Sequence, residues 1–201
     1  MRKIYLMLVL VLVFAGISFA QEVGLLIDDF EGVISGGPEG AVDFGAGNGS
    51  NVEVAVAKDF KQSGTQALKV TFDAVSGGYM WVARGFGLDA KNSAWLVKPE
   101  DIKWKDYNAI AFYMMGSDSK TDVAFDVKDN GGELWRFMAT DNFKGWKQVV
   151  CKFSDFVCRS DWQPDSADKN SQLDFPLKNY QWEPRPVAKG VLYFDDVELL
   201  K

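Results

Sequence analysis

Histidine is absent from this sequence of 201 residues, and cysteine occurs only twice. Without histidine, the chain lacks the usual general base and the Ser-His-Asp and Cys-His arrangements of nucleophilic catalysis. It also lacks the commonest protein ligand of zinc and copper, and two cysteines alone are a poor metal site. These absences exclude the most common classes of hydrolase and of transition-metal site.

Long apolar runs are absent too, except at the N-terminus. There Arg2 and Lys3 precede the apolar residues 5–14, and Ser-Phe-Ala at residues 18–20 is a small-x-small cleavage site. This is the order of a secretory signal peptide, and the run is too short for a comfortable membrane span. The sequence therefore predicts a leader at residues 1–20 and a secreted or periplasmic mature chain without a membrane span. Residues 21–201 have the length of a single domain.

Positive charge is scarce in this chain. It has 22 Lys and Arg against 28 Asp and Glu, a formal net charge of −6, which becomes −8 when Arg2 and Lys3 leave with the leader. No basic patch interleaved with aromatic residues occurs, so nucleic acid is not expected as a partner. An anionic polysaccharide is disfavoured for the same electrostatic reason, whereas a neutral glycan is indifferent to the charge.

Six residues separate the two cysteines, Cys151 and Cys158, in the chain. In an oxidising compartment two such thiols often pair, and the predicted disulfide would pin the start of the loop at residues 159–162. The alternative is that Cys151 is a small buried apolar residue.

Alternation of apolar and polar residues, which is the period of a half-buried strand, dominates the rest of the sequence. Glycine and polar turn residues separate the alternating runs, and only residues 99–102 have the pattern of a short helical turn. About ten strands without a long helix predict an all-β fold, an antiparallel β-sandwich of the jelly-roll type. The predicted strands are residues 23–30, 51–57, 66–72, 79–86, 107–115, 122–128, 133–139, 146–153, 179–183 and 191–199.

Asp-Asn-Gly-Gly at residues 129–132 predicts a hairpin, because Asn and Gly tolerate positive φ. In the strand before it, Asp126 and Lys128 point away from the expected core. The strand after it carries Trp135 and Arg136 on opposite faces. A face with Asp126, Lys128 and one of these two resembles a sugar platform, and the alternative is an ordinary solvated face with one aromatic residue.

A loop near the C-terminus carries Arg159, Asp161 and Trp162 within four residues. Loops run over the surface, so the indole ring of Trp162 has little to pack against except a partner. An aromatic ring covers the apolar C–H face of a pyranose, while a guanidinium and a carboxylate bind its hydroxyl groups. Taken alone, the loop is equally consistent with a sugar site and with a Trp162 that folds back as an anchor.

Five segments of the sequence occur in a characteristic order: residues 26–32 (LIDDFEG), 63–68 (SGTQAL), 145–149 (GWKQV), 153–156 (FSDF) and 190–199 (GVLYFDDVEL). Together they resemble the bacterial carbohydrate-binding modules of family eleven. They also look like the related complex I intermediate-associated proteins of the galactose-binding-like superfamily. The resemblance runs over nearly all of residues 24 to 200.

The resemblance implies a jelly roll that binds mixed-linkage β-1,3-1,4-glucan or cellulose-like β-1,4-glucan on one sheet. The family's Arg-x-Asp-Tyr-Gln-Pro segment is matched by Arg159, Asp161 and Trp162, and its Gly-Tyr strand opening by Tyr79. At the other end of the cleft the family pattern is not kept. Tyr180 or Trp182 is the expected substitute, although alternation does not show which of them faces outward, and Tyr180 is the one assigned to the site. With Asp126 and Trp135, these residues form the predicted carbohydrate-binding set.

The family also implies a structural calcium ion (Ca2+) that ties the first strand to the last. Glu31 and Asp195 are the expected ligands by the family pattern, followed by Asp29, with backbone carbonyl groups near residues 63–66. A hard cation with oxygen ligands suits this composition. The alternative is that these acids are edge charges or turn caps.

These features predict a non-catalytic binder of a neutral polysaccharide, acting in trans with an enzyme or a transporter. One alternative is a protein–protein interaction module of the intermediate-associated type. Another is a glycoside hydrolase or lyase that uses two of Asp126, Glu133 and Asp161, since a pair of carboxylates needs no histidine.

Overall fold

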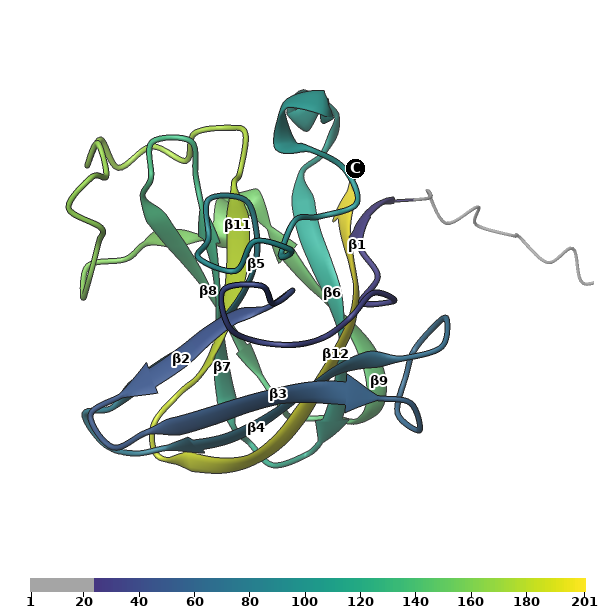
Figure 1. Ribbon diagram of the computed structural model, residues 1–201. Coiled ribbons are helices and arrows are strands. Elements are labelled where there is room, and N and C mark those ends of the chain that lie inside the picture. The colour runs from purple at the N-terminus through teal and green to yellow at the C-terminus, as the bar shows by residue number, and fades with distance from the viewer. Residues whose placement is uncertain (1–23) are drawn as a thin grey trace, which may run out of the picture.

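The computed structural model describes residues 24–201, which form two six-stranded antiparallel sheets (Figure 1). The sheets pack face to face around one core, so the predicted all-β sandwich is confirmed. The leader predicted for residues 1–20 lies outside the described residues. Within residues 24–201, no helix is long and apolar enough to cross a membrane.

The first sheet has the strand order β3-β4-β12-β6-β9, and β1 also pairs with β12. The first and last strands of the described chain are therefore neighbours. The strands are β1 (Leu25–Asp28), β3 (Asn51–Ala57), β4 (Ala67–Ala74), β6 (Ala109–Ser117), β9 (Lys144–Lys152) and β12 (Ala188–Leu200).

The second sheet has the order β10-β8-β7-β11-β5-β2. Its strands are β2 (Asp43–Gly47), β5 (Tyr79–Gly85), β7 (Asp122–Lys128), β8 (Leu134–Thr140), β10 (Val157–Cys158) and β11 (Asn179–Pro184). The hairpin predicted at residues 129–132 joins β7 to β8, where the amide of Asp129 donates to the carbonyl of Glu133 at 3.0 Å. Gly132 takes a φ of 89°, which a side chain would strain.

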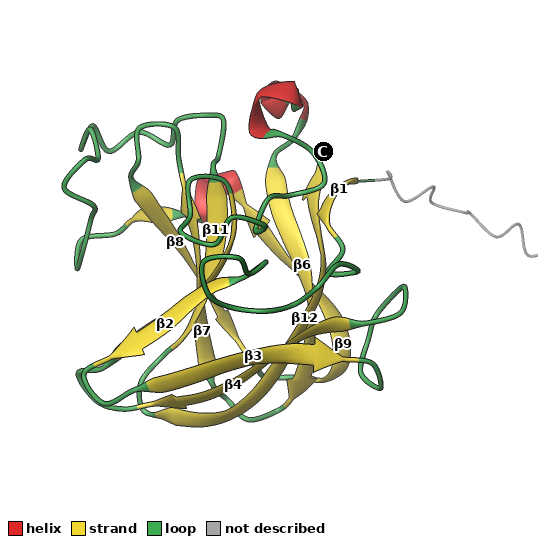
Figure 2. Ribbon diagram, in the orientation of Figure 1, coloured by secondary structure: helices red, strands yellow, loops and turns green. Residues whose placement is uncertain are grey.

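Within residues 24–201, helical structure is confined to three 3-10 turns (Figure 2). They are η1 (Pro99–Asp101), η2 (Trp104–Asp106) and η3 (Phe153–Asp155). The helical turn predicted at residues 99–102 is η1, so this prediction is confirmed.

Aromatic side chains from both sheets fill the middle of the core. Trp182 of β11 stacks on Phe194 of β12 with 4.2 Å between ring centroids, and Phe112 of β6 lies 4.7 Å from Phe125 of β7. All four side chains are fully buried. Burying such large rings is the main favourable contribution to folding, and it sets which face of each strand points inward.

The predicted disulfide is wrong. Cys151 and Cys158 are both free thiols, and they lie in different sheets, on β9 and β10. Cys151 points into the core, as the alternative interpretation proposed, and burial raises the pKa of its thiol. Pinning of the following loop comes instead from Gln163, whose amide pairs with both backbone groups of Leu134 at 2.7 and 2.9 Å.

Candidate functional site

The outer face of the second sheet carries a row of polar side chains. Since Phe125 and Trp182 point into the core, their neighbours along β7 and β11 point outward. The cross-strand register then places Arg136, Asp126 and Gln181 side by side on β8, β7 and β11. This surface is called the outer face below.

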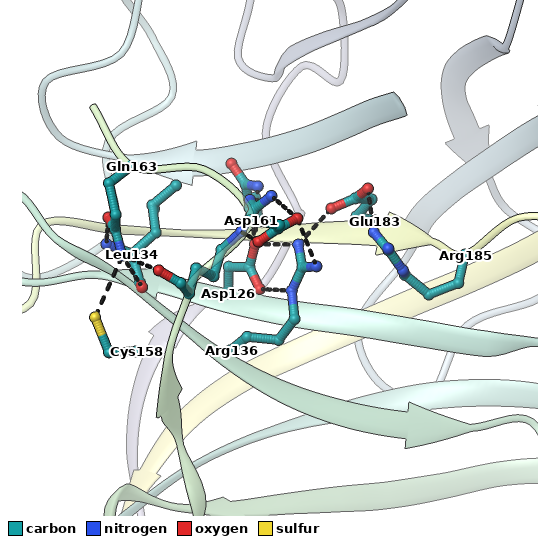
Figure 3. A network of polar contacts seen from close by, with 10 residues as sticks. Asp126, Leu134, Arg136, Cys158, Asp161, Gln163, Glu183 and Arg185 are labelled. Atoms are coloured by element: carbon teal, nitrogen blue, oxygen red, sulfur yellow. Dashed lines mark hydrogen bonds and ion pairs between the residues drawn. The ribbon is translucent and has the colours of Figure 1, made fainter. Parts of the chain in front are cut away.

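An alternating series of charges crosses this outer face, as Figure 3 shows. Arg136 donates to Asp126 from Nε at 2.7 Å and from Nη2 at 2.9 Å. The same Nη2 also donates to Glu183, whose second oxygen accepts from Arg185. On the other side, Arg159 donates to Asp126 at 3.0 Å. Because each charge has an opposite neighbour, the series is rigid and nearly neutral.

Asp126 lies on this face as expected, but it is not open to a ligand. Its side chain is completely covered, and its two oxygens accept from Arg136, Arg159 and Gln181. The expectation of a direct sugar contact from Asp126 is therefore wrong. The carboxylate instead positions the two guanidinium groups above it.

Arg159 and Asp161 form a two-point ion pair at the edge of the outer face. Nε and Nη2 of Arg159 donate to the two oxygens of Asp161 at 3.0 and 2.9 Å. These hydrogen bonds lower the pKa of Asp161 to about 2, although partial burial opposes them. The Asp161 side chain stays about half exposed, so its oxygens can still accept hydrogen bonds from a ligand.

Trp162 follows directly and leaves 57% of its surface exposed. The Arg159 guanidinium carbon lies 5.9 Å from the centre of its ring, within cation–π range. The indole is thus held beside the ion pairs and does not fold back as a core anchor. The structure brings Arg159, Asp161 and Trp162 together as the sequence predicted.

A second aromatic group lies at the opposite side of the same sheet. Tyr79, which is 51% exposed, and Trp81 project from β5 with nearly parallel rings, 6.2 Å apart and 11° between planes. Glycines of the edge strand β2 make room for them: a Cβ on Gly45 would come within 2.5 Å of Trp81, and one on Gly47 within 2.3 Å of Tyr79. Trp81 also donates from its indole nitrogen to Asp43 at 2.9 Å, which fixes the ring.

Two of the predicted site residues do not lie on the outer face. Tyr180 is completely buried, and its hydroxyl donates to Asp28 at 2.6 Å, so its expected sugar contact is wrong. Trp135 packs against the core from the inner side of β8, and its indole nitrogen donates to Asp129 at 3.1 Å. Arg136 takes the outward position that the sequence left open between these two neighbours.

Three further residues of the outer face, Trp81, Gln181 and Glu183, were not predicted from the sequence. Alternation carries a signal for Trp81, which is two residues from Tyr79 and must share its face. Along β11, bulky and polar residues alternate, and alternation does not show which of the two sets points inward. Only the packing of Tyr180 and Trp182 into the core places Gln181 and Glu183 outside.

The predicted calcium ligands lie where the chain ends meet. Glu31 accepts from the amides of Thr65 and Gln66 at 2.8 and 3.2 Å, and Asp195 accepts from Gln62 and Ser63 at 2.8 and 3.2 Å. The loop at residues 62–66 thus turns its amides, rather than its carbonyls, towards these acids. Burial raises the pKa of Asp195 to about 6.

Other oxygen atoms gather at the same place. Burial, together with repulsion from Asp29 and Glu31, raises the pKa of Asp196. The carbonyl groups of Phe30 and Gly32 both lie 2.6 Å from the side-chain nitrogen of Gln66. In residues 24–201, however, no group of three or more His, Cys, Asp or Glu side chains is arranged to hold a metal ion. Any cation here would depend on backbone oxygens as well.

Comparison with solved structures supports the fold. The family 11 carbohydrate-binding module from Clostridium thermocellum, in complex with a β-1,3-1,4-mixed-linked tetrasaccharide, has a TM-score of 0.67 at 22% identity, covering 89% of this chain and 96% of that one. The family 11 module of the cellulosomal cellulase Lic26A-Cel5E of the same organism has a TM-score of 0.64 at 19% identity, with 89% and 94% covered.

Comparison with curated proteins gives two relatives. Endoglucanase H of Acetivibrio thermocellus is 28% identical over 149 residues, which are 74% of this chain and 15% of that protein. Mannan endo-1,4-beta-mannosidase of Bifidobacterium adolescentis is 24% identical over 147 residues, 73% of this chain and 13% of that protein. The chain therefore matches a small part of each of these longer proteins.

The sequence profile of the carbohydrate binding domain of family 11 matches residues 20–201, almost the whole chain. That match agrees with the two-sheet fold and with the exposed aromatic and charged groups on the outer face. The chain belongs to family 11 of the carbohydrate-binding domains.

Proposed function

We propose that the outer face binds a neutral polysaccharide of the β-1,3-1,4- or β-1,4-glucan type without cleaving it. The observation that carries this proposal is the placement of Trp162, more than half exposed and held beside Arg159 and Asp161. An exposed indole next to a fixed donor and a fixed acceptor is suited to the C–H face and the hydroxyl groups of one sugar ring.

The positions of Trp162 and of the Tyr79–Trp81 pair suggest how a polysaccharide would lie on the outer face. Three strands separate β10, which leads to Trp162, from β5, which carries Tyr79 and Trp81. At about 4.8 Å per strand, this spans roughly 19 Å. A ligand that reaches both groups must therefore have several sugar units, and it would pass over Arg136, Gln181 and Glu183. Because ion pairs and hydrogen bonds already hold these polar side chains, they would lose little conformational freedom on binding.

Hydrolysis is less well supported by the same groups. A general acid needs a carboxyl that is protonated near neutral pH, whereas the pKa of Asp161 is lowered to about 2. Asp126 is completely buried and accepts hydrogen bonds from Arg136, Arg159 and Gln181. Glu133 is buried too, with one oxygen accepting from the amide of Ser171. Two of these three carboxylates are therefore buried and the exposed one, Asp161, is ionised, so none is placed to act as a general acid.

The direct test is electrophoresis in native gels that contain a soluble β-glucan, together with a reducing-sugar assay. We expect the protein to be retarded by mixed-linkage β-glucan and to release no reducing ends. Retardation by none of the neutral glucans tested, or hydrolysis of the polymer, would contradict the proposal. Exclusive capture of a protein partner would favour the interaction-module alternative.

Binding should be insensitive to mild acid. The pKa of Asp161 is depressed, so its ionised form, which pairs with Arg159, persists until the pH falls towards about 2. We expect equal affinity for a mixed-linkage β-glucan oligosaccharide at pH 8, 6 and 4, measured by isothermal titration calorimetry. A loss of affinity with a midpoint between pH 4 and 6 would show that another carboxyl controls binding.

We also propose that a calcium ion joins the two ends of the described chain, held by Glu31 and Asp195 with Asp29 nearby. The support is the raised pKa of Asp195 and Asp196 and the convergence of the carbonyl groups of Phe30 and Gly32. A bound cation would relieve the repulsion among these acids and stabilise the pairing of β1 with β12.

Removal of calcium should then lower the melting temperature. A ligand at a hundred times its Kd stabilises the native state by about 2.7 kcal/mol, which corresponds to roughly 5–10 °C for a domain of this size. We expect this shift between calcium and chelator in the wild type. Glu31→Gln should lose the shift, whereas Glu39→Gln, at an exposed position, should keep it. Equal melting temperatures in calcium and chelator would refute the site.

A secreted or periplasmic location fits this function, because polysaccharides of this kind lie outside the cytoplasm. The two curated relatives are named as glycan-degrading enzymes, and the matched segment is a small part of each. We therefore propose that this chain brings a glycan to such an enzyme or to a transporter.

A further inference from the structure

The first sheet also has a side that points away from the core. Phe112 and Met114 of β6 are fully buried in the core, so the residues that follow each of them, Tyr113 and Met115, point outward. The cross-strand register places Trp146 of β9 directly beside Met115 on this side. Because the two sheets pack face to face, this surface lies on the opposite side of the sandwich from the outer face.

Apolar side chains form much of this surface. Tyr113, Met115 and Trp146 are each partly exposed. Val150, four residues after Trp146 on the same side of β9, is 43% exposed. These four residues are called the first-sheet patch below. Aromatic residues and methionine are enriched where proteins associate, and an exposed apolar patch is typical of such a contact.

Charges of opposite sign lie on two sides of the first-sheet patch. Lys144 and Lys152, at the two ends of β9, alternate with Trp146 and Val150 and are both exposed. Glu198 of β12 lies on the other side, since the register leads from it across β6 to Val150. At about 4.8 Å per strand, the two strands that carry these charges are roughly 10 Å apart. The lysines and the acid are therefore separated by the apolar patch.

Within residues 24–201, none of these three charged side chains forms an ion pair. Glu198 accepts a hydrogen bond from the side chain of Gln148 at 2.9 Å. Burial, together with repulsion from Asp196, raises the pKa of Glu198, as expected for a carboxylate that has no cation beside it. A cation supplied by a partner would therefore stabilise this carboxylate.

A second copy of this chain carries the charges that complement this surface. A two-fold axis through β6 would place β9 of each copy over β12 of the other, so that lysines of one copy meet Glu198 of its partner. The chain as a whole has a formal net charge of −6, and two copies repel in most orientations. On this side of β6, β9 and β12 the unpaired charges nearly balance, with two lysines against Asp195, Asp196 and Glu198.

The edge of the sheet is a poorer contact than its face. β9 is an edge strand, so a second copy could in principle extend the sheet by pairing with it. Antiparallel pairing centred on Gln148 would place Lys144 of one copy opposite Lys152 of the other. Like charges directly opposite each other are destabilising, and lysines on an edge strand oppose sheet extension. The charges thus favour contact through the face.

We propose that two copies of the chain associate back to back through the first-sheet patch. Its four apolar side chains form the centre of the contact, and Glu198 of each copy pairs at the rim with Lys144 or Lys152 of the other. Both outer faces then point away from the contact, so the dimer offers two surfaces to two polysaccharide segments. This last consequence rests on the proposed function, whereas the association does not.

The test is sedimentation equilibrium of the protein without glycan over a range of concentrations. We expect the wild type to show a reversible equilibrium between monomer and dimer. The acid-reversed variant, Glu198→Lys, and the lysine-reversed variant, Lys144→Glu with Lys152→Glu, should each dimerise about tenfold more weakly, because both symmetric contacts become repulsive. An equimolar mixture of these two variants should form a heterodimer, since both contacts are then complementary again.

Two further variants separate the contact from a change in net charge. Asp165→Lys, at an exposed position in the loop after Trp162, changes the charge by the same amount as Glu198→Lys and should dimerise as wild type does. Val150→Asp places a charge in the centre of the patch and should abolish the dimer. Because Val150 is exposed, the melting temperature of this variant should stay close to that of the wild type.

Four results would overturn the proposal. They are a monomer at every concentration of the wild type, an unchanged dimer in Val150→Asp, no heterodimer in the mixture, or equal weakening by Asp165→Lys. A separate titration with a β-glucan oligosaccharide should give the same affinity for the wild type and for Val150→Asp. Absence of binding in both would refute the proposed function, while sedimentation would still decide the association.

Discussion

Replacing Trp162 by alanine is expected to remove most of the retardation by β-glucan. Stacking of one ring on an aromatic side chain contributes roughly 1–3 kcal/mol, by analogy with base stacking. Trp162 is exposed and lies in a loop held by Gln163, so its removal should leave the fold intact. Affinity should therefore fall by roughly 5- to 150-fold with little change in melting temperature.

Phe60→Ala is the matched control for this experiment. Phe60 is 45% exposed and packs against Tyr193 of β12, in the other sheet, with 4.8 Å between ring centroids and the rings tilted by 30°. The Phe60→Ala variant should bind β-glucan as the wild type does. Trp162→Tyr should keep part of the affinity because it retains a ring, and Tyr79→Ala should weaken binding independently. Unchanged retardation of both Trp162→Ala and Tyr79→Ala would show that the site lies elsewhere.

Replacing Asp28 by alanine is expected to lower the free energy of unfolding by roughly 3–5 kcal/mol, because it leaves a buried charge unpaired. Asp28 accepts from Arg84 at 2.7 and 2.6 Å and from the hydroxyl of Tyr180 at 2.6 Å. Burial opposes the charge of Arg84, but the hydrogen bonds and the charge of Asp28 outweigh this effect and raise its pKa. Urea denaturation of the variant and the wild type gives the difference directly.

An exposed ion pair nearby provides the control. Lys91 pairs with Glu39, and both side chains are mostly open to solvent. Glu39→Ala should change the free energy of unfolding by less than about 1 kcal/mol. Replacing both buried partners, Asp28→Leu with Arg84→Met, should recover much of the loss, because no unpaired charge remains. If Asp28→Ala costs no more than Glu39→Ala, the buried pair does not have the role assigned to it here.

Most of the fold followed from alternation in the sequence. Ten of the twelve strands in residues 24–201 correspond to predicted alternating runs, all but β2 and the two-residue β10, and the hairpin at residues 129–132 and the turn η1 were also predicted. The strand β2 was missed because its sequence, DFGAG, is rich in glycine and has no β-branched residue. Its glycines are needed by the rings of Tyr79 and Trp81, which are contributed by a different strand.

The candidate site was predicted only in part. The loop of Arg159, Asp161 and Trp162 was identified because a large aromatic side chain in a surface loop does not pack in the core and is therefore available to a partner. Trp135 was assigned to the wrong face because β8 has bulky residues on both sides, and Tyr180 because the sequence did not show whether the aromatic or the polar side of β11 is buried. Alternation shows which residues share a face, but it does not show which of the two faces is buried.

By itself, the sequence determined the all-β sandwich, the family, and the exposed loop with its aromatic residue, since these depend on local periodicity and on short motifs. Tertiary structure decided which side of β8 and β11 points outward, that the carboxylate of Asp126 is buried beneath two arginines, and that Cys151 and Cys158 lie apart. These outcomes depend on contacts between strands that are distant in the chain. The side that packs against the opposite sheet becomes the core, and only the remaining side is free to bind.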